Sequence, residues 1–538
     1  MSRDRNTWRT RGWLAVGAVA LAALLAGATT SGAGAAQGPA NRGHGAPVVS
    51  TSGGAIKGVA TATTDKFLGV PYAAPPVGAL RWRAPQPAAR WHGVRDATQF
   101  APHCAQPAGP FGKGSTSEDC LYLNVFTPAN HSGRPLPVMV WIHGGALVTG
   151  ESDDYDPTNL VGDGAIVVTI NYRLGALGFL AHPALLGQGG SSGNYGLMDQ
   201  QAALRWVQQN IGQFGGDKHN VSIFGESAGG LSVLSQVASK GARGLFDKAI
   251  VESGTYNLTQ TSLADAETAG EAFATKAGCA NQNAASQTAA CLRGLPVSTI
   301  VADENQSGYT PDLDGVVLTQ SLRPAFASGQ FNRVPIINGT NHDEWRLFVA
   351  LDTLAGMPVT AANYQSTISS TLGVPATVAA VIAAQYPLSA FPSPPVALGA
   401  VGTDAIFACN AFTVDQSVSK FVPTYSYEFN DENAPQDFLP AVGFPYGAAH
   451  ASEIQYVFNT AASQVVTGLS AQQVRLAGTM QRYWTNFAAR GFPSSFGTPF
   501  WAPFHNVSTR TQSFVAPTPT VETNFSTEHH CAFWNAAA

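Results

Sequence analysis

Several short segments of the chain consist almost entirely of hydrophobic residues. Segments of this kind are typical of strands that are buried on both faces of a sheet. They occupy residues 138–142, 166–170, 221–224, 249–251, 334–337 and 425–429. Between the second and third of them, Leu204, Val207 and Ile211 lie at helical spacing within residues 198–211. This succession of strand, helix and strand predicts an α/β fold with helices on the faces of the sheet.

The organisation of the chain favours one large domain. A length of 538 residues would allow about three domains, but the sequence contains no internal repeat and no long charged linker. Residues 37–47 are rich in Gly, Ala and Pro and are expected to form a flexible lead-in. The domain is predicted to span residues 48–538, with helices and loops inserted near residues 360–395.

The first 36 residues have the features of a signal peptide. Four arginines precede an apolar run at residues 13–28, and small residues follow as far as Ala36. This pattern predicts cleavage before Gln37 and a secreted, extracellular protein. The absence of an Arg-Arg pair favours the general secretion route over the twin-arginine route. An uncleaved anchor is the alternative, although the run is short for a span and no similar run occurs later.

Composition and charge narrow the class of protein. Hydrophobic residues make up 45% of the chain and charged residues 12%, which is enough apolar material for a large core. The leader carries a net charge of +3, so the formal charge of −5 becomes −8 without it. An acidic body without runs of Lys or Arg matches a phosphate backbone poorly, so we expect no nucleic-acid partner.

The cysteines all lie beyond the leader, at positions 104, 120, 279, 291, 409 and 531. An even number in an exported chain indicates disulfides, although spacing alone allows 15 pairings. The close pairs Cys104/Cys120 and Cys279/Cys291 favour two local loops, which leaves Cys409 for Cys531. No Cys-x-x-Cys motif or His-rich cluster indicates a zinc site, and we expect no metal or other cofactor.

The pattern Gly-x-Ser-x-Gly, which surrounds the nucleophile of many hydrolases, occurs twice. Around Ser191 it lies in a run of Gly, Gln, Ser and Asn without a preceding strand, so a flexible loop is expected. Around Ser227 it follows the hydrophobic run 221–224 and precedes residues 230–238, which can form a helix. A strained strand-to-helix turn would expose the side chain of Ser227, and the flanking glycines would let the turn close. Ser227 is the candidate nucleophile, and an ordinary glycine-rich turn is the alternative.

Several longer motifs resemble the type-B carboxylesterase family of α/β-hydrolases. They are FGESAGG at 224–230, EDCLYLNV at 118–125, WIHGG at 141–145, NYRLGALGFL at 171–180 and GNYGLMDQQAALRWVQQNIGQFGGD at 193–217. The resemblance extends from about Val48 to Trp534. It implies an α/β-hydrolase fold, with a mostly parallel central sheet flanked by helices and with helical insertions. It also implies hydrolysis of carboxylic esters by a serine nucleophile.

In α/β-hydrolases the catalytic groups follow the chain order Ser, acid, His. His450 lies in a loop of small residues, 447–453, whose setting resembles the catalytic-histidine loop of the family. The runners-up, expected at the surface or in loops, are His342, His529 and His530. Asp343 and Glu344 are adjacent carboxylates after the strand at 334–338, and spacing cannot distinguish them. The resemblance to the Asp-Glu pair of the family selects Glu344, and Asp343 is expected to be solvated.

The oxyanion of a tetrahedral intermediate requires two or three backbone N–H donors. Ala228, directly after the candidate nucleophile, would supply one, and Gly145 and Ala146 would supply the others. Where the family commonly has three glycines, the chain reads Gly144-Gly145-Ala146. We expect the alanine to be tolerated provided that its φ is negative. A simple turn at the end of the strand is the alternative for this segment.

The substrate is predicted from the loop that the first cysteine pair encloses. In the family this loop often forms a lid or carries an aromatic residue that binds cationic alcohols. Here it is short, with Phe111 as its only aromatic residue and no Trp. Both features favour an esterase for short- to medium-chain esters, and a lipase or sterol esterase for longer chains is the alternative. Candidates for the pocket lining, which could equally be core, are Leu147, Trp345, Leu347 and Phe348.

A function of a different class is a non-catalytic adhesion or binding module with the same fold. Such modules have lost the serine, whereas Ser227, Glu344 and His450 are all present here. A metal-dependent hydrolase is a weaker alternative because the sequence contains no visible ligand cluster. The expected partner is a small-molecule or lipid-like ester, and no membrane span is expected in the mature chain.

Overall fold

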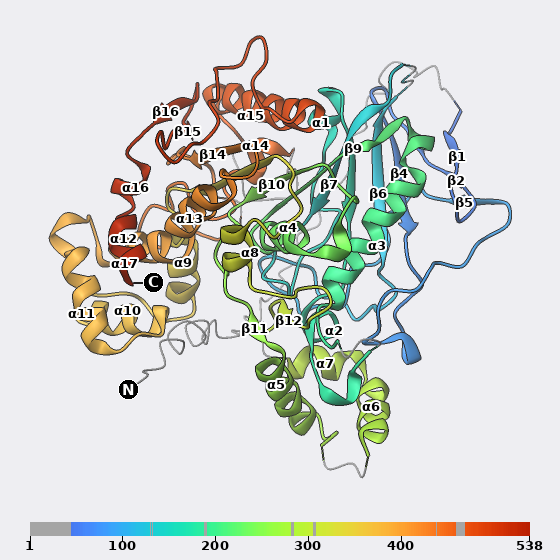
Figure 1. Cartoon of the computed structure of the whole chain (residues 1–538), viewed down its shortest axis with the longest axis horizontal. Helices are drawn as coiled ribbons and strands as arrows, with labels where there is room; N and C mark the ends of the chain where they lie inside the picture. The colour runs from blue at the N-terminus through green and yellow to red at the C-terminus, as the bar shows by residue number, and fades with distance from the viewer. Residues whose placement is uncertain are drawn as a thin grey trace, which may run out of the picture.

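The computed structural model describes residues 45–537, except for residues 130, 132, 188–190, 281–283, 305–307, 437 and 459–467. The predicted signal peptide, residues 1–36, lies outside the described residues, as does most of the predicted lead-in. Within the described part, an 11-stranded sheet runs through the centre of the molecule in the order β16-β15-β14-β13-β10-β9-β7-β8-β6-β4-β3 (Figure 1). This sheet and the helices around it match the α/β fold expected from the hydrophobic runs.

The central strands of the sheet are parallel, and the strands at both edges are antiparallel. The strands of this sheet are β3 (Val59–Ala60), β4 (Thr64–Pro71), β6 (Tyr122–Pro128), β7 (Leu136–Ile142), β8 (Ile166–Ile170), β9 (Gly216–Glu226), β10 (Lys248–Glu252), β13 (Ile336–Asn341), β14 (Thr424–Phe429), β15 (Thr511–Phe514) and β16 (Thr520–Glu522). Two small sheets contain β1 (Val48–Ser50), β2 (Ala55–Lys57) and β5 (Val94–Asp96), and β11 (Thr261–Ser262) and β12 (Asp312–Leu313).

Helices cover both faces of the central strands. Val140 and Ile142 of β7 belong to one core cluster, which includes residues of α3 (Tyr195–Asn210), α4 (Ala228–Ala238) and α8 (Leu322–Ser328). The alternate residue Trp141 belongs to a second cluster on the opposite face. That cluster includes residues of α1 (Thr158–Gly162), α14 (Ile454–Val457) and α15 (Ala471–Arg490). Because both faces are buried, these strands contain hydrophobic residues at consecutive positions.

Further helices lie around the ends of the sheet and form the insertions (Figure 1). They are α2 (Gly175–Phe179), α5 (Leu263–Lys276), α6 (Ala285–Gly294), α7 (Val297–Asp303), α9 (Arg346–Leu354), α10 (Tyr364–Leu372), α11 (Ala376–Gln385), α12 (Pro394–Gly402), α13 (Cys409–Val418), α16 (Phe525–Glu528) and α17 (Cys531–Ala537). A π-helical segment, η6 (Thr403–Ala408), joins α12 to α13. The helices α10 to α12 agree with the insertion expected near residues 360–395.

One helical stretch is long and apolar enough to cross a membrane by length and composition. It is Pro394–Val418, which comprises α12, η6 and α13, and the sequence analysis did not identify it. In the structure, 72% of its most apolar window is buried inside the protein. Burial of this extent is typical of a core helix in a globular protein.

Three disulfides are present: Cys104–Cys120, Cys279–Cys291 and Cys409–Cys531. They are the pairs that the sequence spacing favoured. The first two close local loops, with sequence separations of 16 and 12 residues. The third joins the start of α13 to the start of α17 across 122 residues, so it connects the C-terminal helix to the π-helical segment through α13.

Candidate functional site

Ser227 lies in the turn between β9 and α4, with a φ of 56° and a ψ of −120°. A positive φ is strained for a residue other than glycine. The two flanking glycines allow this conformation because the turn is packed against β7. A Cβ on Gly225 would lie 2.6 Å from the carbonyl oxygen of Ile142, and a Cβ on Gly229 would collide with the same oxygen. The local requirement for glycine is the one expected from the Gly-x-Ser-x-Gly pattern.

Three side chains from separate parts of the chain meet at this turn. The Nε2 atom of His450 lies 2.8 Å from Oγ of Ser227, and its Nδ1 atom lies 2.5 Å from Oε2 of Glu344. The other carboxylate oxygen of Glu344 accepts hydrogen bonds from the Thr340 hydroxyl at 2.7 Å and from Asn341 N–H at 2.8 Å. These bonds fix the carboxylate, which in turn orients the imidazole.

The loop that follows β7, residues 143–150, is rich in glycine. This glycine-rich loop packs directly against the nucleophile turn, which is the turn that contains the candidate nucleophile Ser227. A Cβ on Gly144 would lie 3.2 Å from Cβ of Ser227 and 2.8 Å from a carboxylate oxygen of Glu226. Among the described residues, no backbone carbonyl accepts a hydrogen bond from the N–H groups of Gly145 and Ala146. Ala228 is the first residue of α4 and has no intrahelical acceptor for its N–H. These N–H groups are the candidate donors to an oxyanion.

The conformation of Ala146 differs from the sequence expectation. Its φ is +57°, not negative, and the φ of Leu147 is +62°. The glycine-rich loop thus keeps a left-handed backbone even where glycine has been replaced. A left-handed conformation costs an L-residue roughly 1–2 kcal/mol, so the segment 146–147, which follows Gly144 and Gly145, is strained close to Ser227.

Further buried carboxylates lie near His450, and Glu226 is next to Nε2, the ring nitrogen that faces Ser227. Oε1 of Glu226 lies 3.2 Å from Nε2 of the imidazole. Burial raises the pKa of Glu226 well above 4.5. Burial also raises the pKa of Glu453 to about 7 and that of Glu252 to about 8. For His450, burial alone would lower the pKa, but the charges of Glu226 and Glu344 outweigh it and raise the pKa to about 9.

Two aromatic rings pack beside the same imidazole. The ring centroids of Phe348 and Phe407 lie 5.2 Å and 5.1 Å from that of His450. Trp345 stacks on Phe348 at 4.4 Å. Of the predicted pocket residues, Phe348 thus lies beside the imidazole, and Trp345 stacks on Phe348. Leu347 instead belongs to a separate cluster that includes Ala449, and Leu147, which is buried, packs in the core beneath the glycine-rich loop.

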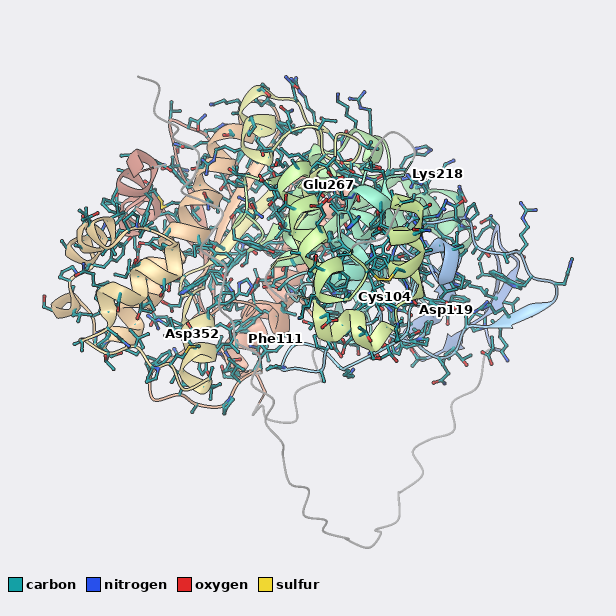
Figure 2. All side chains as sticks on the ribbon, turned by 90° about the horizontal axis from the view of Figure 1, so that it is seen from below. Cys104, Phe111, Asp119, Lys218, Glu267 and Asp352 are labelled. Carbon is teal, nitrogen blue, oxygen red and sulfur yellow. A yellow bond between two sulfur atoms is a disulfide. The ribbon has the colours of Figure 1, made fainter. Side chains whose placement is uncertain are left out.

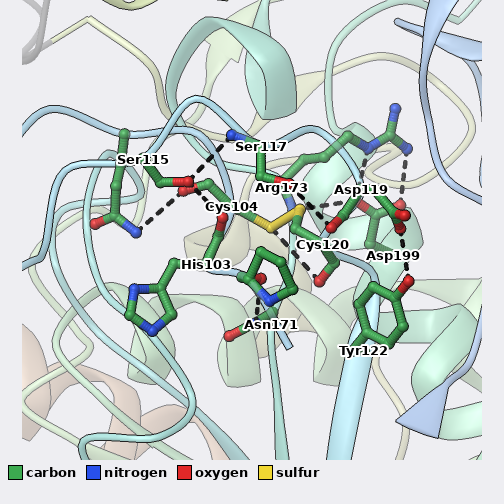
Figure 3. The surroundings of a disulfide bond; sticks show 12 residues. His103, Cys104, Ser115, Ser117, Asp119, Cys120, Tyr122, Asn171, Arg173 and Asp199 are labelled. Carbon is green, nitrogen blue, oxygen red and sulfur yellow. Dashed lines mark hydrogen bonds and ion pairs between the residues drawn. A yellow bond between two sulfur atoms is a disulfide. The ribbon is translucent and has the colours of Figure 1, made fainter. Parts of the chain in front are cut away.

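The loop closed by the first disulfide is a short hairpin, and Figure 3 shows its base around Cys104 and Cys120. The side-chain amide of Gln106 bonds both N–H and C=O of Gly150, at 2.8 Å and 3.0 Å. At the tip, Phe111 packs against the cluster that contains Leu347 (Figure 2). The hairpin is therefore docked on the glycine-rich loop and reaches α9.

The structure differs from the expectation for Asp343. This residue is buried, and its carboxylate accepts a hydrogen bond from Ala448 N–H at 3.0 Å and forms an ion pair with Arg346 at 2.8 Å, so it is not solvated. His529 lies in the turn between α16 and α17, which agrees with the expected loop position, and its side chain is buried between two carboxylates. Ser191 lies in an irregular segment and is buried; the preceding Gly189 and Gly190 lie outside the described residues.

Sequence reasoning missed two residues that contact the imidazole. Glu226 lies inside the Gly-x-Ser-x-Gly motif at the variable position, and only the fold turns its side chain toward His450. Phe407 lies more than 40 residues before His450 in an apolar segment that has no motif of its own. Within the described residues, no group of three or more His, Cys, Asp and Glu is arranged to hold a metal ion.

The sequence matches a family model described as the carboxylesterase family over residues 45–534. It is 36% identical to the acylcarnitine hydrolase of Mus musculus over 485 residues, 85% of each chain. It is 36% identical to the fumonisin B1 esterase of Sphingopyxis macrogoltabida over 472 residues, 84% of each chain. It is 35% identical to the para-nitrobenzyl esterase of Bacillus subtilis (strain 168) over 480 residues, which cover 86% of this chain and 94% of that protein.

Proposed function

This chain belongs to the carboxylesterase family and is a carboxylic ester hydrolase, and we propose that it acts through an acyl-enzyme on Ser227, with His450 as the general base and Glu344 as the carboxylate that orients His450. The observation that carries the proposal is the pair of hydrogen bonds from Ser227 through His450 to Glu344, at 2.8 Å and 2.5 Å. A serine hydroxyl requires such a base near neutral pH.

In the proposed reaction, Nε2 of His450 takes the hydroxyl proton of Ser227 as Oγ attacks the ester carbonyl. The N–H groups of Gly145, Ala146 and Ala228 stabilise the oxyanion. The imidazolium then protonates the leaving alcohol, and a water molecule hydrolyses the acyl-enzyme by the same route in reverse. The carboxylate of Glu344 accepts Nδ1–H throughout and stabilises the charged imidazole.

The preferred substrates of the proposed enzyme are esters with short to medium acyl chains. Supporting this, the hairpin between Cys104 and Cys120 is short, and the imidazole is closely covered by Phe348 and Phe407. A bulky or long acyl chain would have to displace these rings. A lipase or sterol esterase is the alternative reading of the same catalytic groups.

Secretion is part of the proposal. It is supported by the leader at residues 1–36 and by three disulfides, which persist in oxidising compartments. The burial of Pro394–Val418 supports a protein without a membrane span in its mature form.

The test is to label the purified protein with a fluorophosphonate and to locate the adduct by mass spectrometry. Hydrolysis of p-nitrophenyl acetate, butyrate and palmitate is measured in parallel. We expect an adduct on Ser227 and faster turnover of acetate and butyrate than of palmitate. Ser191→Ala, at the second Gly-x-Ser-x-Gly, is the matched control and is expected to keep labelling and turnover, whereas Ser227→Ala loses both.

Two other outcomes would each decide between alternatives. Preferential turnover of palmitate would replace the short-chain proposal with the lipase reading. Folded protein that neither forms an adduct nor hydrolyses any of the three esters would contradict Ser227 as the nucleophile.

A further inference from the structure

His529 is held by a carboxylate on each of its ring nitrogens. Nδ1 lies 2.6 Å from Oδ1 of Asp404, and Nε2 lies 2.6 Å from Oε1 of Glu428. All three side chains are buried, with 5% or less of each exposed. Neutral imidazole has one N–H, whereas the cation has two. Two carboxylates at this distance therefore favour an imidazolium, and a protonated ring has no lone pair left for a metal ion.

The charges around His529 agree with a permanent cation. Burial would lower its pKa, but the charges of Glu428 and Asp404 outweigh burial and raise it to about 10. Burial would raise the pKa of Glu428, and His529 instead lowers it to about 2. His342 lies nearby, with its ring 5.7 Å away, and is itself bonded to Glu528. The network is therefore expected to carry charge near neutral pH.

The three partners come from three separate elements. Glu428 is in β14, Asp404 is in the π-helical segment η6, and His529 is between α16 and α17. The second oxygen of Asp404 accepts a hydrogen bond from the Tyr386 hydroxyl at 2.6 Å, and Trp534 of α17 donates to that hydroxyl at 2.7 Å. The C-terminal segment is therefore attached to η6 by these polar contacts as well as by the Cys409–Cys531 disulfide.

The same π-helical segment reaches the candidate active site. Phe407, three residues after Asp404, lies against the ring of His450 with 5.1 Å between the ring centroids. Thr403, next to Asp404, accepts a hydrogen bond through its hydroxyl oxygen from Trp345 N–H at 3.0 Å. Trp345 directly follows Glu344 in the chain. Segments of π-helix are rare, and where they occur within α-helices they are frequently found at functional sites.

From these contacts we infer that His529 is a positioning residue for ester hydrolysis: together with Asp404 and Glu428, it fixes η6 so that Phe407 holds the imidazole of His450 in line with Ser227. This inference rests on the proposed role of Ser227, His450 and Glu344. If it holds, the geometry of the candidate active site also depends on a buried ionic group that lies outside the family motifs.

The test is a double-mutant cycle between His529 and Phe407, two residues that act on the imidazole in series. His529→Gln keeps a hydrogen-bonding side chain but removes the cation. With p-nitrophenyl butyrate we expect its kcat to fall about tenfold, because small misplacement of a catalytic group is costly, while KM changes less than twofold. In a Phe407→Ala background the same substitution should change kcat by less than about twofold. The reason is that the contact of Phe407 with His450, through which His529 acts, is already absent.

Asp404→Asn is the milder second variant, because it is nearly isosteric and leaves His529 paired with Glu428. It keeps the test decisive if His529→Gln does not fold. Its kcat should fall in the same direction, by about threefold, and that fall should also disappear in the Phe407→Ala background. The matched control is Asp199→Asn, which breaks another buried ion pair, between Asp199 of α3 and Arg173, at 2.7 Å. We expect that control to lower thermal stability and to leave kcat unchanged.

Three outcomes would overturn the inference. One is an unchanged kcat in folded His529→Gln or Asp404→Asn. Another is a loss of kcat that is fully additive with Phe407→Ala. The third is an equal loss of kcat in Asp199→Asn, which would assign the effect to general destabilisation. Failure of the proposed function is distinguished beforehand, because the parent protein would then not form a fluorophosphonate adduct at Ser227.

Discussion

Strained residues concentrate around the candidate nucleophile. Ser227, Ala146 and Leu147 all have a positive φ, and none of them is glycine. Strain of this kind persists only where the surrounding structure enforces it, and it is common at active sites. Here close packing enforces it: the glycine-rich loop and the nucleophile turn approach each other so closely that Gly144 has no room for a Cβ.

Replacing Ala146 with glycine should relieve part of this strain. The left-handed conformation costs alanine roughly 1–2 kcal/mol, and the greater freedom of glycine in the unfolded chain offsets part of the gain. We expect the free energy of unfolding to rise by about 1 kcal/mol in chemical denaturation. Ala203→Gly in the interior of α3 is the control and should lower it by about 1 kcal/mol. A similar loss in both variants would contradict strain at Ala146.

Glu226→Gln should shift the pH dependence of hydrolysis. The carboxylate of Glu226 raises the pKa of His450, which must be unprotonated to act as a base. The activity of the parent protein should therefore rise with pH up to about 9. Removing the carboxylate lowers the pKa of His450, so the acidic limb of the kcat/KM profile should move to lower pH. Glu118→Gln, in the ion pair with Arg81, should leave that limb in place; an unchanged limb in Glu226→Gln would rule out this coupling.

The sequence predicted the meeting of Ser227, Glu344 and His450 but not their electrostatic surroundings. Motifs and chain order identify such residues because the chemistry restricts their type and sequence. The burial of Asp343 and His529 and the approach of Glu226 to His450 depend on elements that are distant in the chain. Likewise, the positive φ of Ala146 departs from the intrinsic preference of alanine and could not be predicted from the residue type.

At the scale of elements, the turn between β9 and α4 depends on two glycines for steric reasons. A Cβ on Gly229 would collide with the carbonyl oxygen of Ile142 in the neighbouring strand. Gly229→Ala should therefore displace the turn and reduce kcat/KM by about 100-fold or more, because the nucleophile moves with it. Gly212→Ala is the control, since a Cβ there meets nothing within 4 Å. Near-normal kinetics of Gly229→Ala with p-nitrophenyl butyrate would contradict this account.

The elements that the sequence predicted are those with the strongest patterns. The six hydrophobic runs correspond to β7, β8, β9, β10, β13 and β14, and the amphipathic segment corresponds to α3. The antiparallel strands β3 and β16 were not predicted, since they contain only two and three residues. The longer antiparallel strands β4 and β6, with eight and seven residues, were also not predicted. The segment η6 also escaped prediction, because a π-helical turn within an apolar stretch has no distinct periodicity.

At the scale of the whole molecule, the three disulfides should contribute unequally to stability. In the chain-entropy model a cross-link stabilises more when it closes a longer loop, by about 5 kcal/mol for the Cys409–Cys531 loop and about 3 kcal/mol for the Cys279–Cys291 loop. Cys409→Ala/Cys531→Ala should therefore lower the midpoint of urea denaturation more than Cys279→Ala/Cys291→Ala. The reverse order would indicate that local packing, not loop length, decides the contribution.

The attachment of the C-terminal segment to η6 also has a consequence for timing. A ribosome adds Ser227, Glu344 and His450 to the growing chain before it adds His529 and Cys531. The three proposed catalytic groups therefore exist on the nascent polypeptide before the residues that we infer to fix Phe407 against the imidazole. On the proposed function, we expect full ester hydrolysis only after residues 525–537 have been synthesised and have docked, so an unfinished chain should be a poor catalyst.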